Sequence, residues 1–199
     1  EKTRADICLY NFDIVFEDES QKSNASGLIK EKKTSGEILD FISQYKVLEP
    51  SKIKGLLNFT SLGWARGYSG GVVFPELENR NYEDFVYMAM LLNAKRITAM
   101  PSSYKPLTYL RRSSSVTGNR TSKTFVDVMK QLEKFYLSIS DDVRINNKDE
   151  IKDFIQRKIH QYRELLSSLI DSPQHPDITE QTLKNYDNMV QNLMKLAAD

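Results

Sequence analysis

Apolar residues crowd the first stretch of the chain, and their pattern predicts β-structure. Residues 6–16 are rich in β-branched, aromatic and aliphatic side chains, which is typical of a strand with a buried face. Residues 17–27 are acidic, then rich in Ser and Asn, and predict a loop. Residues 28–33 predict a second strand paired with the first. In residues 36–45 the apolar spacing favours a short amphipathic helix that ends before Pro50.

The middle of the chain, residues 52–75, has no regular apolar period and is the part richest in glycine. Because glycine allows tight turns and close approach to another backbone, this segment predicts irregular, loop-rich structure. Residues 72–74 predict a short strand at its end.

After Pro75 the apolar residues recur with helical spacing. Asn81 is placed to cap a first helix. The apolar face of that helix comprises Phe85, Met88, Ala89 and Leu92. Pro101 and Pro106 then enforce an extended connector, and residues 113–122 predict a polar loop. The next helix is predicted to begin at Thr121 or Ser122. Its buried face comprises Phe125, Val128, Met129, Leu132, Phe135 and Ile139.

The last part of the chain predicts two amphipathic helices, over residues 148–171 and 178–197. Asn147 with Glu150, and Asp177 with Glu180, match the spacing of helix-capping pairs. Two apolar stripes joined by a short proline-containing loop predict an antiparallel helical hairpin. We expect this hairpin either to pack on its own domain or to pair with a partner helix or a second copy of the chain.

Together these elements predict an α+β protein. A β-rich part with a glycine-rich loop occupies residues 1–75, and a mainly helical part occupies residues 76–199, either as two parts or as one continuous domain. The lone cysteine, Cys8, excludes an internal disulfide, and its apolar neighbours indicate a buried thiol in a strand. No apolar run is long enough for a membrane helix, so we expect an intracellular protein without membrane association.

The formal net charge of +1 excludes a protein that coats nucleic acid by bulk charge alone, but it leaves room for a local basic surface. Such a surface is predicted in residues 95–123, a segment without Asp or Glu. Tyr104 and Tyr109 lie between its cations. The cations are Lys95, Arg96, Lys105, Arg111, Arg112, Arg120 and Lys123. Cations neutralise phosphates and aromatic rings stack on unpaired bases, so the segment predicts binding of RNA or single-stranded DNA.

Two other interpretations of this segment stay open. A basic, solvated loop, or one that faces an acidic protein, has the same composition. Serines at 113 and 114 follow Arg111 and Arg112, a pattern typical of a kinase site, and a phosphate there would reverse much of the local charge.

A second candidate site lies in the glycine-rich stretch. Arg66 is flanked by Trp64 and Tyr68, a combination that suits a phosphate or a flat ligand held by charge and stacking. The glycine spacing matches neither a Walker loop nor a dinucleotide-binding fingerprint. The alternative is a set of turns whose aromatic residues anchor them to the core.

A third candidate is catalytic. Asp13 or Asp18, followed by Glu31 and Lys33, resembles the PD-(D/E)xK nucleases, in which two acids on neighbouring strands hold a divalent metal. The proline expected before the aspartate is replaced by Phe12, and a charged, solvent-facing hairpin explains the same residues. The two histidines, His160 and His175, do not suggest a general base.

The sequence therefore predicts a non-catalytic nucleic-acid-binding protein that needs no cofactor or metal. Its main rival is a scaffold or assembly subunit that binds protein through the helical hairpin. A metal-dependent nuclease is the enzymatic alternative.

Overall fold

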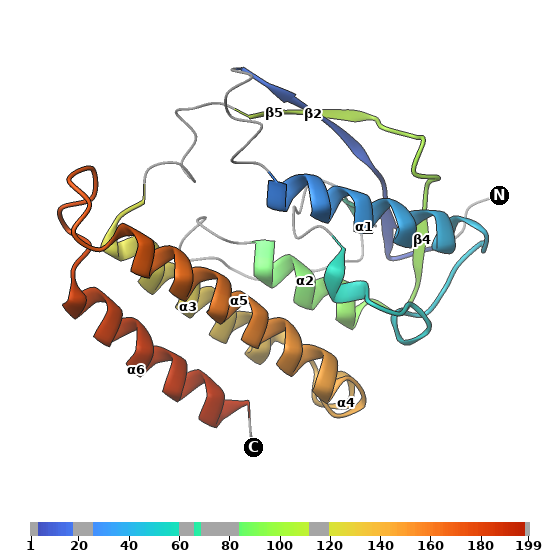
Figure 1. Ribbon diagram of the computed structural model, residues 1–199. Coiled ribbons are helices and arrows are strands. Elements are labelled where there is room, and N and C mark those ends of the chain that lie inside the picture. The colour runs from blue at the N-terminus through green and yellow to red at the C-terminus, as the bar shows by residue number, and fades with distance from the viewer. Residues whose placement is uncertain (1–3, 18–25, 60–65, 69–83, 112–119, 198–199) are drawn as a thin grey trace. The chain divides into compact units, whose positions relative to one another are not determined.

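The chain is an α+β protein with short strands in its N-terminal part and helices in its C-terminal half (Figure 1). The computed structural model describes residues 4–17, 26–59, 66–68, 84–111 and 120–197. The chain divides into two compact units. Unit 1 comprises residues 1–76 and 87–115, and unit 2 comprises residues 77–86 and 116–199.

The sheet of unit 1 is built on the first strand. Strand β1 (Ile7–Leu9) lies between β3 (Arg66–Tyr68), with which it is antiparallel, and β4 (Ile97–Ala99), with which it is parallel. Ile7, Leu9 and Ile97 are almost wholly buried. The predicted strand in residues 6–16 is confirmed, although it is interrupted at residues 10 and 11. The predicted strand at residues 72–74 lies outside the described residues.

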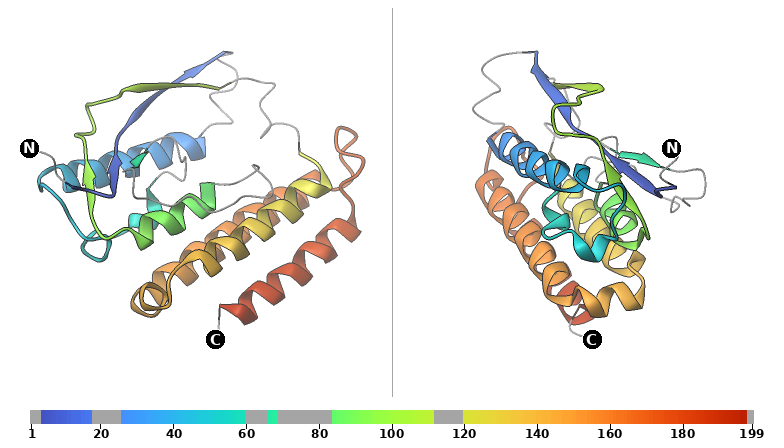
Figure 2. Two further views of the ribbon diagram at one scale, coloured as in Figure 1. Left: turned by 180° about the vertical axis from the view of Figure 1, so that it is seen from behind. Right: turned by 90° about the vertical axis from the view of Figure 1, so that its right-hand side faces the viewer.

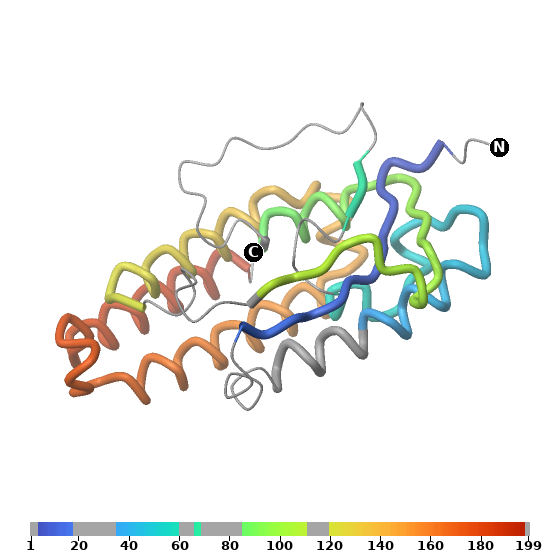
Figure 3. Tube along the Cα trace, turned by 90° about the horizontal axis from the view of Figure 1, so that it is seen from above, coloured from blue at the N-terminus to red at the C-terminus, as the bar shows by residue number. Residues whose placement is uncertain are grey.

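A second pair of parallel strands continues the first. Strand β2 (Phe12–Phe16) pairs with β5 (Leu107–Arg111), so two long segments of the chain run side by side (Figure 3). Between the two pairs, the Met100 amide donates to the Leu9 carbonyl oxygen at 2.9 Å. Neither β4 nor β5 is predicted by the sequence pattern, which indicates only an extended connector there. Parallel pairing depends on residues about ninety positions away, and local patterns do not contain that information.

The predicted strand over residues 28–33 is wrong. These residues belong to α1 (Ser26–Ser43), which also includes the helix predicted in residues 36–45. Four of them are Lys or Glu, which favour a helix at least as strongly as a strand. The partners of the first strand segment are instead β3, β4 and β5. Helix α1 lies beside β4 (Figure 2) and buries Ile38, Leu39 and Ile42.

Unit 1 also includes two 3₁₀ turns and residues 87–93 of a further helix, whose first residues, 84–86, belong to unit 2. Two 3₁₀ turns, η2 (Pro50–Lys52) and η3 (Leu56–Asn58), follow α1, and the second contacts it. Gly55 has φ +68°, a left-handed conformation that glycine adopts without steric penalty. Helix α2 (Asp84–Asn93) contributes further buried residues, which confirms the predicted apolar face. They are Phe85, Met88, Ala89 and Leu92. Asn81, its predicted cap, lies outside the described residues.

Unit 2 is a helical bundle that contains the predicted hairpin. Helix α3 (Ser122–Ser138) begins where the sequence predicts and is followed by the short helix α4 (Asp141–Asn146). Helices α5 (Lys148–Leu169) and α6 (Glu180–Leu196) form the hairpin, and both contact α3 (Figure 1). The hairpin therefore packs on its own unit, which was one of the two expectations.

Aromatic contacts join the three long helices of unit 2. The ring centroids of Phe125 and Tyr186 lie 6.4 Å apart edge to face, and those of Phe135 and Phe154 lie 5.0 Å apart. The buried hydroxyl of Tyr186 donates to the carbonyl oxygen of Ile159 at 2.9 Å, and burial raises the pKa of this phenol. The apolar stripe of the hairpin is thus used inside the unit.

Asn147 is the N-cap residue of α5, as predicted, but the cap of α6 differs from the prediction. Helix α6 is capped by Thr179, whose amide donates to Thr182 Oγ1 at 3.1 Å. Asp177 instead accepts a hydrogen bond from the backbone amide of Ser122, at 2.7 Å, and so caps the start of α3. Asp177, which the sequence spacing places near the start of α6, thus caps α3 instead.

Candidate nucleic-acid interface

The basic segment, residues 95–123, is divided between the two units. Its described part in unit 1 runs from the residues before β4 to the end of β5, and its described part in unit 2 is the start of α3. Arg112 lies outside the described residues. Arg111 is the last residue of β5.

Lys95 and Arg96 lie just before β4, and an acid fixes their backbone. Asp6 Oδ2 accepts hydrogen bonds from the amides of both residues, each at 2.9 Å, and the Asp6 amide donates to the Arg96 carbonyl oxygen at 2.8 Å. Because the carboxylate is bound to backbone amides, it orders the loop while the Lys95 side chain remains exposed to solvent. The arrangement holds the start of the basic segment in one backbone conformation.

The connector between β4 and β5 is also held by side chains. Asp40 of α1 accepts from the Ser102 amide at 2.9 Å and from its hydroxyl at 2.8 Å. The Asn11 amide group donates to the Ser102 carbonyl oxygen at 2.7 Å. Tyr104 follows in this turn with about half of its surface exposed (49%). An aromatic side chain on an ordered turn is a suitable platform for a base, because little conformational entropy is lost when the base stacks.

Lys105 is the next cation, and it is partly neutralised. Its ammonium lies 3.0 Å from a carboxylate oxygen of Asp13 on β2, and both side chains are partly exposed. A surface ion pair of this kind contributes at most about 1 kcal/mol, so a phosphate can compete for the lysine.

Strand β5 carries apolar side chains as well as Tyr109. The Tyr109 side chain is half-buried and pairs in register with Ile14. On the same strand pair, Leu107, Leu110 and Val15 expose between 41% and 48% of their surface. Solvent-exposed leucine is unusual for a parallel pair, which generally has both faces covered.

The unit 2 part of the segment begins with Arg120. Its carbonyl oxygen accepts from His175 Nδ1 at 2.8 Å, and its side chain is half-buried, whereas Lys123 in the first turn of α3 is exposed. The carboxylate of Asp177 lies at the same helix start. Hydrogen bonds from Ser122, chiefly from its backbone amide, lower the pKa of Asp177. This acid reduces the net positive charge around Arg120 and Lys123.

The second candidate site, around Arg66, lies within unit 1. Arg66 in β3 is 3% exposed; its Nη2 is 2.8 Å from the Met88 sulfur, and its guanidinium lies 5.8 Å from the centre of the Phe59 ring. Tyr68 is half-buried, with its ring 6.4 Å from that of Tyr87. Trp64 lies outside the described residues. A side chain this deeply buried is placed to pack against the core rather than to contact a polymer.

The residues of the nuclease hypothesis do not share a strand pair. Asp13 is in β2, whereas Glu31 and Lys33 are in helix α1. Asp18 lies outside the described residues. Within the described residues, no group of three His, Cys, Asp or Glu side chains is placed to hold a metal ion. Cys8 lies in β1 as predicted; its side chain is half-buried, and desolvation raises the pKa of its thiol.

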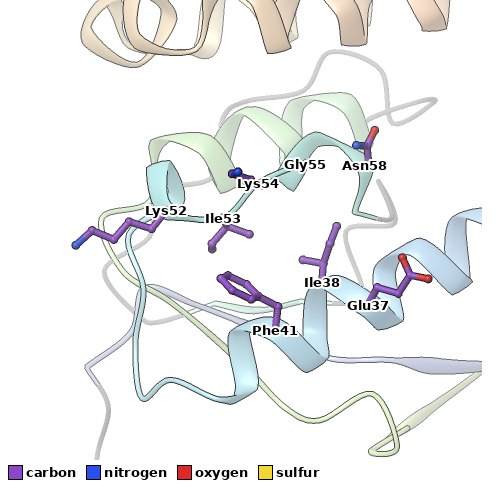
Figure 4. Close-up of a pocket in the computed structure, with 8 residues that line it drawn as sticks. All are labelled: Glu37, Ile38, Phe41, Lys52, Ile53, Lys54, Gly55 and Asn58. Carbon is purple, nitrogen blue, oxygen red and sulfur yellow. The ribbon is translucent and has the colours of Figure 1, made fainter.

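A pocket in unit 1 was not foreseen from the sequence. It has a volume of about 560 Å³ and lies between α1 and the loop that carries η2 and η3 (Figure 4). Its lining residues are Glu37, Ile38, Phe41, Lys52, Ile53, Lys54, Gly55 and Asn58. The signal available in the sequence was the exposed aromatic position of Phe41 on the α1 face that also carries Ile38.

No protein-family model matches this chain, and comparisons with curated proteins and with solved structures also found no match. None of the helices in the described part of the chain is both long and apolar enough to cross a membrane.

Proposed function

We propose that this protein binds single-stranded nucleic acid without catalysis, through residues 95–123. The observation that carries the proposal is the ordered β4–β5 connector, which presents exposed Tyr104 beside exposed Lys105 in a segment that has no acid. Phosphates and an unpaired base are the chemical groups that such a pair binds together.

The roles divide by side-chain chemistry. Lys95 and Lys105 contact phosphates at the β4–β5 connector and the residues before β4 in unit 1. Lys123, in unit 2, is a further phosphate ligand that the sequence predicts. Tyr104 supplies the stacking surface. Arg111, Arg112 and Arg120 are the further phosphate ligands that the sequence predicts.

The proposal makes a quantitative prediction for the salt dependence of nucleic-acid binding. The logarithm of the association constant should fall linearly with the logarithm of the salt concentration, with a slope of about −0.7 for each phosphate neutralised on a single strand. Five to seven cations thus predict a slope of roughly −3.5 to −5. A protein held by non-electrostatic contacts would show a slope near zero.

The test is fluorescence-anisotropy titration of labelled single-stranded RNA and DNA at several salt concentrations. Changing Lys95 and Lys105 together to Ala should weaken binding about tenfold and reduce the salt slope by about 1.4. The matched control changes Lys152 and Lys184, two exposed lysines of α5 and α6, to Ala and should leave binding unchanged.

Stacking is tested separately. Tyr104→Ala should cost about 1–3 kcal/mol of binding free energy without changing the salt slope, because a ring carries no charge. The triple change of Arg111, Arg112 and Arg120 to Ala, made in the otherwise unchanged protein, should abolish most of the binding. Absence of binding at low salt, or equal losses in the Lys152 and Lys184 control, would refute the proposal.

The rival function, a scaffold that binds protein through the helical hairpin, has less support from the described residues. It requires an available apolar stripe on the hairpin, and Leu166, Tyr186 and Leu193 are at most 3% exposed in the single chain. The arrangement of α3, α5 and α6 uses that stripe in packing.

A further inference from the structure

The pocket of unit 1 has an apolar floor formed from two elements. Ile38 and Phe41 come from α1, and Ile53 faces them from the loop between the two 3₁₀ turns (Figure 4). Ile38 and Ile53 are 8% and 3% exposed, whereas Phe41 keeps 40% of its surface exposed. The Phe41 ring is steadied by Tyr45, whose ring centroid lies 5.4 Å away. Phe41 therefore supplies most of the accessible apolar surface of this floor, and the buried Ile38 and Ile53 lie behind it.

The rim of the pocket is charged unevenly. Glu37 lies at one end and Lys52 at the other (Figure 4), and Lys54 follows Lys52 on the loop side. Lys52 lies 3.8 Å from a Glu49 carboxylate oxygen, so part of its charge is offset, while the Lys54 side chain is exposed. The loop side of the pocket, where Figure 4 places Lys54 beside Gly55, is thus positive, whereas Glu37 on α1 is negative.

The backbone geometry around Gly55 fixes the chain at Lys54. Gly55, in its left-handed conformation, turns the chain between Lys54 and the buried residues Leu56 and Leu57. A Cβ at this position would lie 3.1 Å from Nδ2 of the Asn58 side chain. The loop is held by these buried leucines on one side and by η2 on the other, so Lys54 projects from an ordered backbone.

We propose that this pocket binds a small amphipathic monocarboxylate. The apolar body of the ligand lies on Ile38, Phe41 and Ile53, and its carboxylate lies at Lys54, away from Glu37. A volume of about 560 Å³ is in the range of pockets that take small molecules, and a mostly apolar lining with few polar groups is typical of them. Glu37 disfavours a ligand with negative charge at both ends, which is why a single anionic head is assigned.

This site is separate from the proposed nucleic-acid interface. None of its lining residues belongs to residues 95–123, so either proposal can fail without affecting the other.

The experiment is titration of the ¹⁵N-labelled full chain with decanoate, below the concentration at which it forms micelles, followed by amide chemical shifts. We expect saturable binding with a dissociation constant on the order of 0.1–1 mM, as a ligand of this size allows. The shifts should be concentrated at Glu37–Phe41 and Lys52–Asn58. Decanol, which has the same apolar body without the charge, should bind about five- to tenfold more weakly.

Two matched pairs of variants locate the contacts. Lys54→Gln should weaken decanoate binding about five- to tenfold, whereas Lys46→Gln, at another exposed lysine of unit 1, should leave it unchanged. Phe41→Ala should weaken the binding of both ligands, whereas Tyr45→Ala, which removes an exposed ring outside the lining, should have a smaller effect. All four positions are exposed, so the variants are expected to fold, and unchanged far-ultraviolet circular dichroism checks this.

The result that overturns the proposal is equally defined. Decanoate shifts that do not saturate, shifts spread over the chain, equal affinity for decanol and decanoate, or identical affinities of the Lys54 and Lys46 variants would each refute it.

Discussion

The cap that Asp177 provides to α3 gives a sharp test of how the hairpin of unit 2 is fixed. The first amides of a helix have no intrahelical acceptor, and here the Ser122 amide donates to a carboxylate 55 residues away in the chain. Asp177→Ala removes both the acceptor and its negative charge, and Asp177→Asn removes the charge but keeps an oxygen acceptor.

The magnitude follows from two contributions. Loss of a capping acceptor costs typically about 1 kcal/mol. Loss of a negative charge at a helix start costs about 0.3–1 kcal/mol, and the lower half of that range applies because Asp177 is exposed. We therefore expect Asp177→Ala to lower the free energy of unfolding by about 1–1.5 kcal/mol and Asp177→Asn by about 0.5 kcal/mol.

The pH dependence supplies a second, independent readout. The pKa of Asp177 is lower in the folded protein than in the unfolded chain, so its stabilisation is present above the unfolded pKa and is lost as pH falls through the folded pKa. The difference between the original protein and Asp177→Asn should thus be constant from neutral pH down to about pH 5, and should shrink below about pH 4.

Urea unfolding followed by far-ultraviolet circular dichroism measures these differences, and hydrogen exchange at the start of α3 localises them. Glu133→Gln, at an exposed acid on α3 itself, is the matched control and should change neither. The reasoning is refuted if Asp177→Ala is within about 0.2 kcal/mol of the original protein at neutral pH, since a lost cap costs at least about 0.5 kcal/mol. It is also refuted if the Asn variant differs by the same amount at pH 7 and pH 3.

Two further predictions concern buried and backbone interactions. Tyr186→Phe removes the hydroxyl that donates to the Ile159 carbonyl oxygen, so it should lower the free energy of unfolding by about 1–2 kcal/mol in urea unfolding. A change of less than about 0.3 kcal/mol would contradict a stabilising role for this hydrogen bond. Gly55→Ala should destabilise the protein by about 1–2 kcal/mol, because alanine is strained at φ +68°. Gly36→Ala should stabilise it by about 0.5–1 kcal/mol, because alanine favours the helix α1 and the added methyl would meet only Ser102 Cβ, at 3.8 Å. Thermal unfolding of the two glycine variants should therefore shift in opposite directions, and shifts of the same sign would contradict this account.

The long amphipathic helices were predictable because their signal is local. In α3, α5 and α6 the apolar residues repeat at helical spacing, and a helix forms its hydrogen bonds within a few residues. The strand segment in residues 7–16 was predictable for a similar reason, since its side chains suit a buried sheet. The α+β class follows from these elements alone.

The predicted secondary structure is wrong or incomplete where the local sequence suits two conformations and a contact with a distant segment selects one of them. Leu28 and Ile29 before a charged run suit a strand or a helix, and the charged residues extend α1 backward to Ser26. Strands β4 and β5 are short, and they become strands because β1 and β2 lie parallel to them. Such pairing requires loop closure over most of unit 1, so it is a property of the fold and not of the segment.

For the candidate sites, the sequence determined which residue types are present, and the tertiary structure decided which of them reach solvent. The acid-free run of residues 95–123 is visible in the sequence, whereas the hydrogen bonds that its amides donate to Asp6 and Asp40 are not. Arg66 reads as a ligand-binding residue in the sequence and is buried against Met88 in the fold. The reason is physical: periodicity and propensity act over a few residues, but burial and the partners of a charge depend on which distant segments pack together.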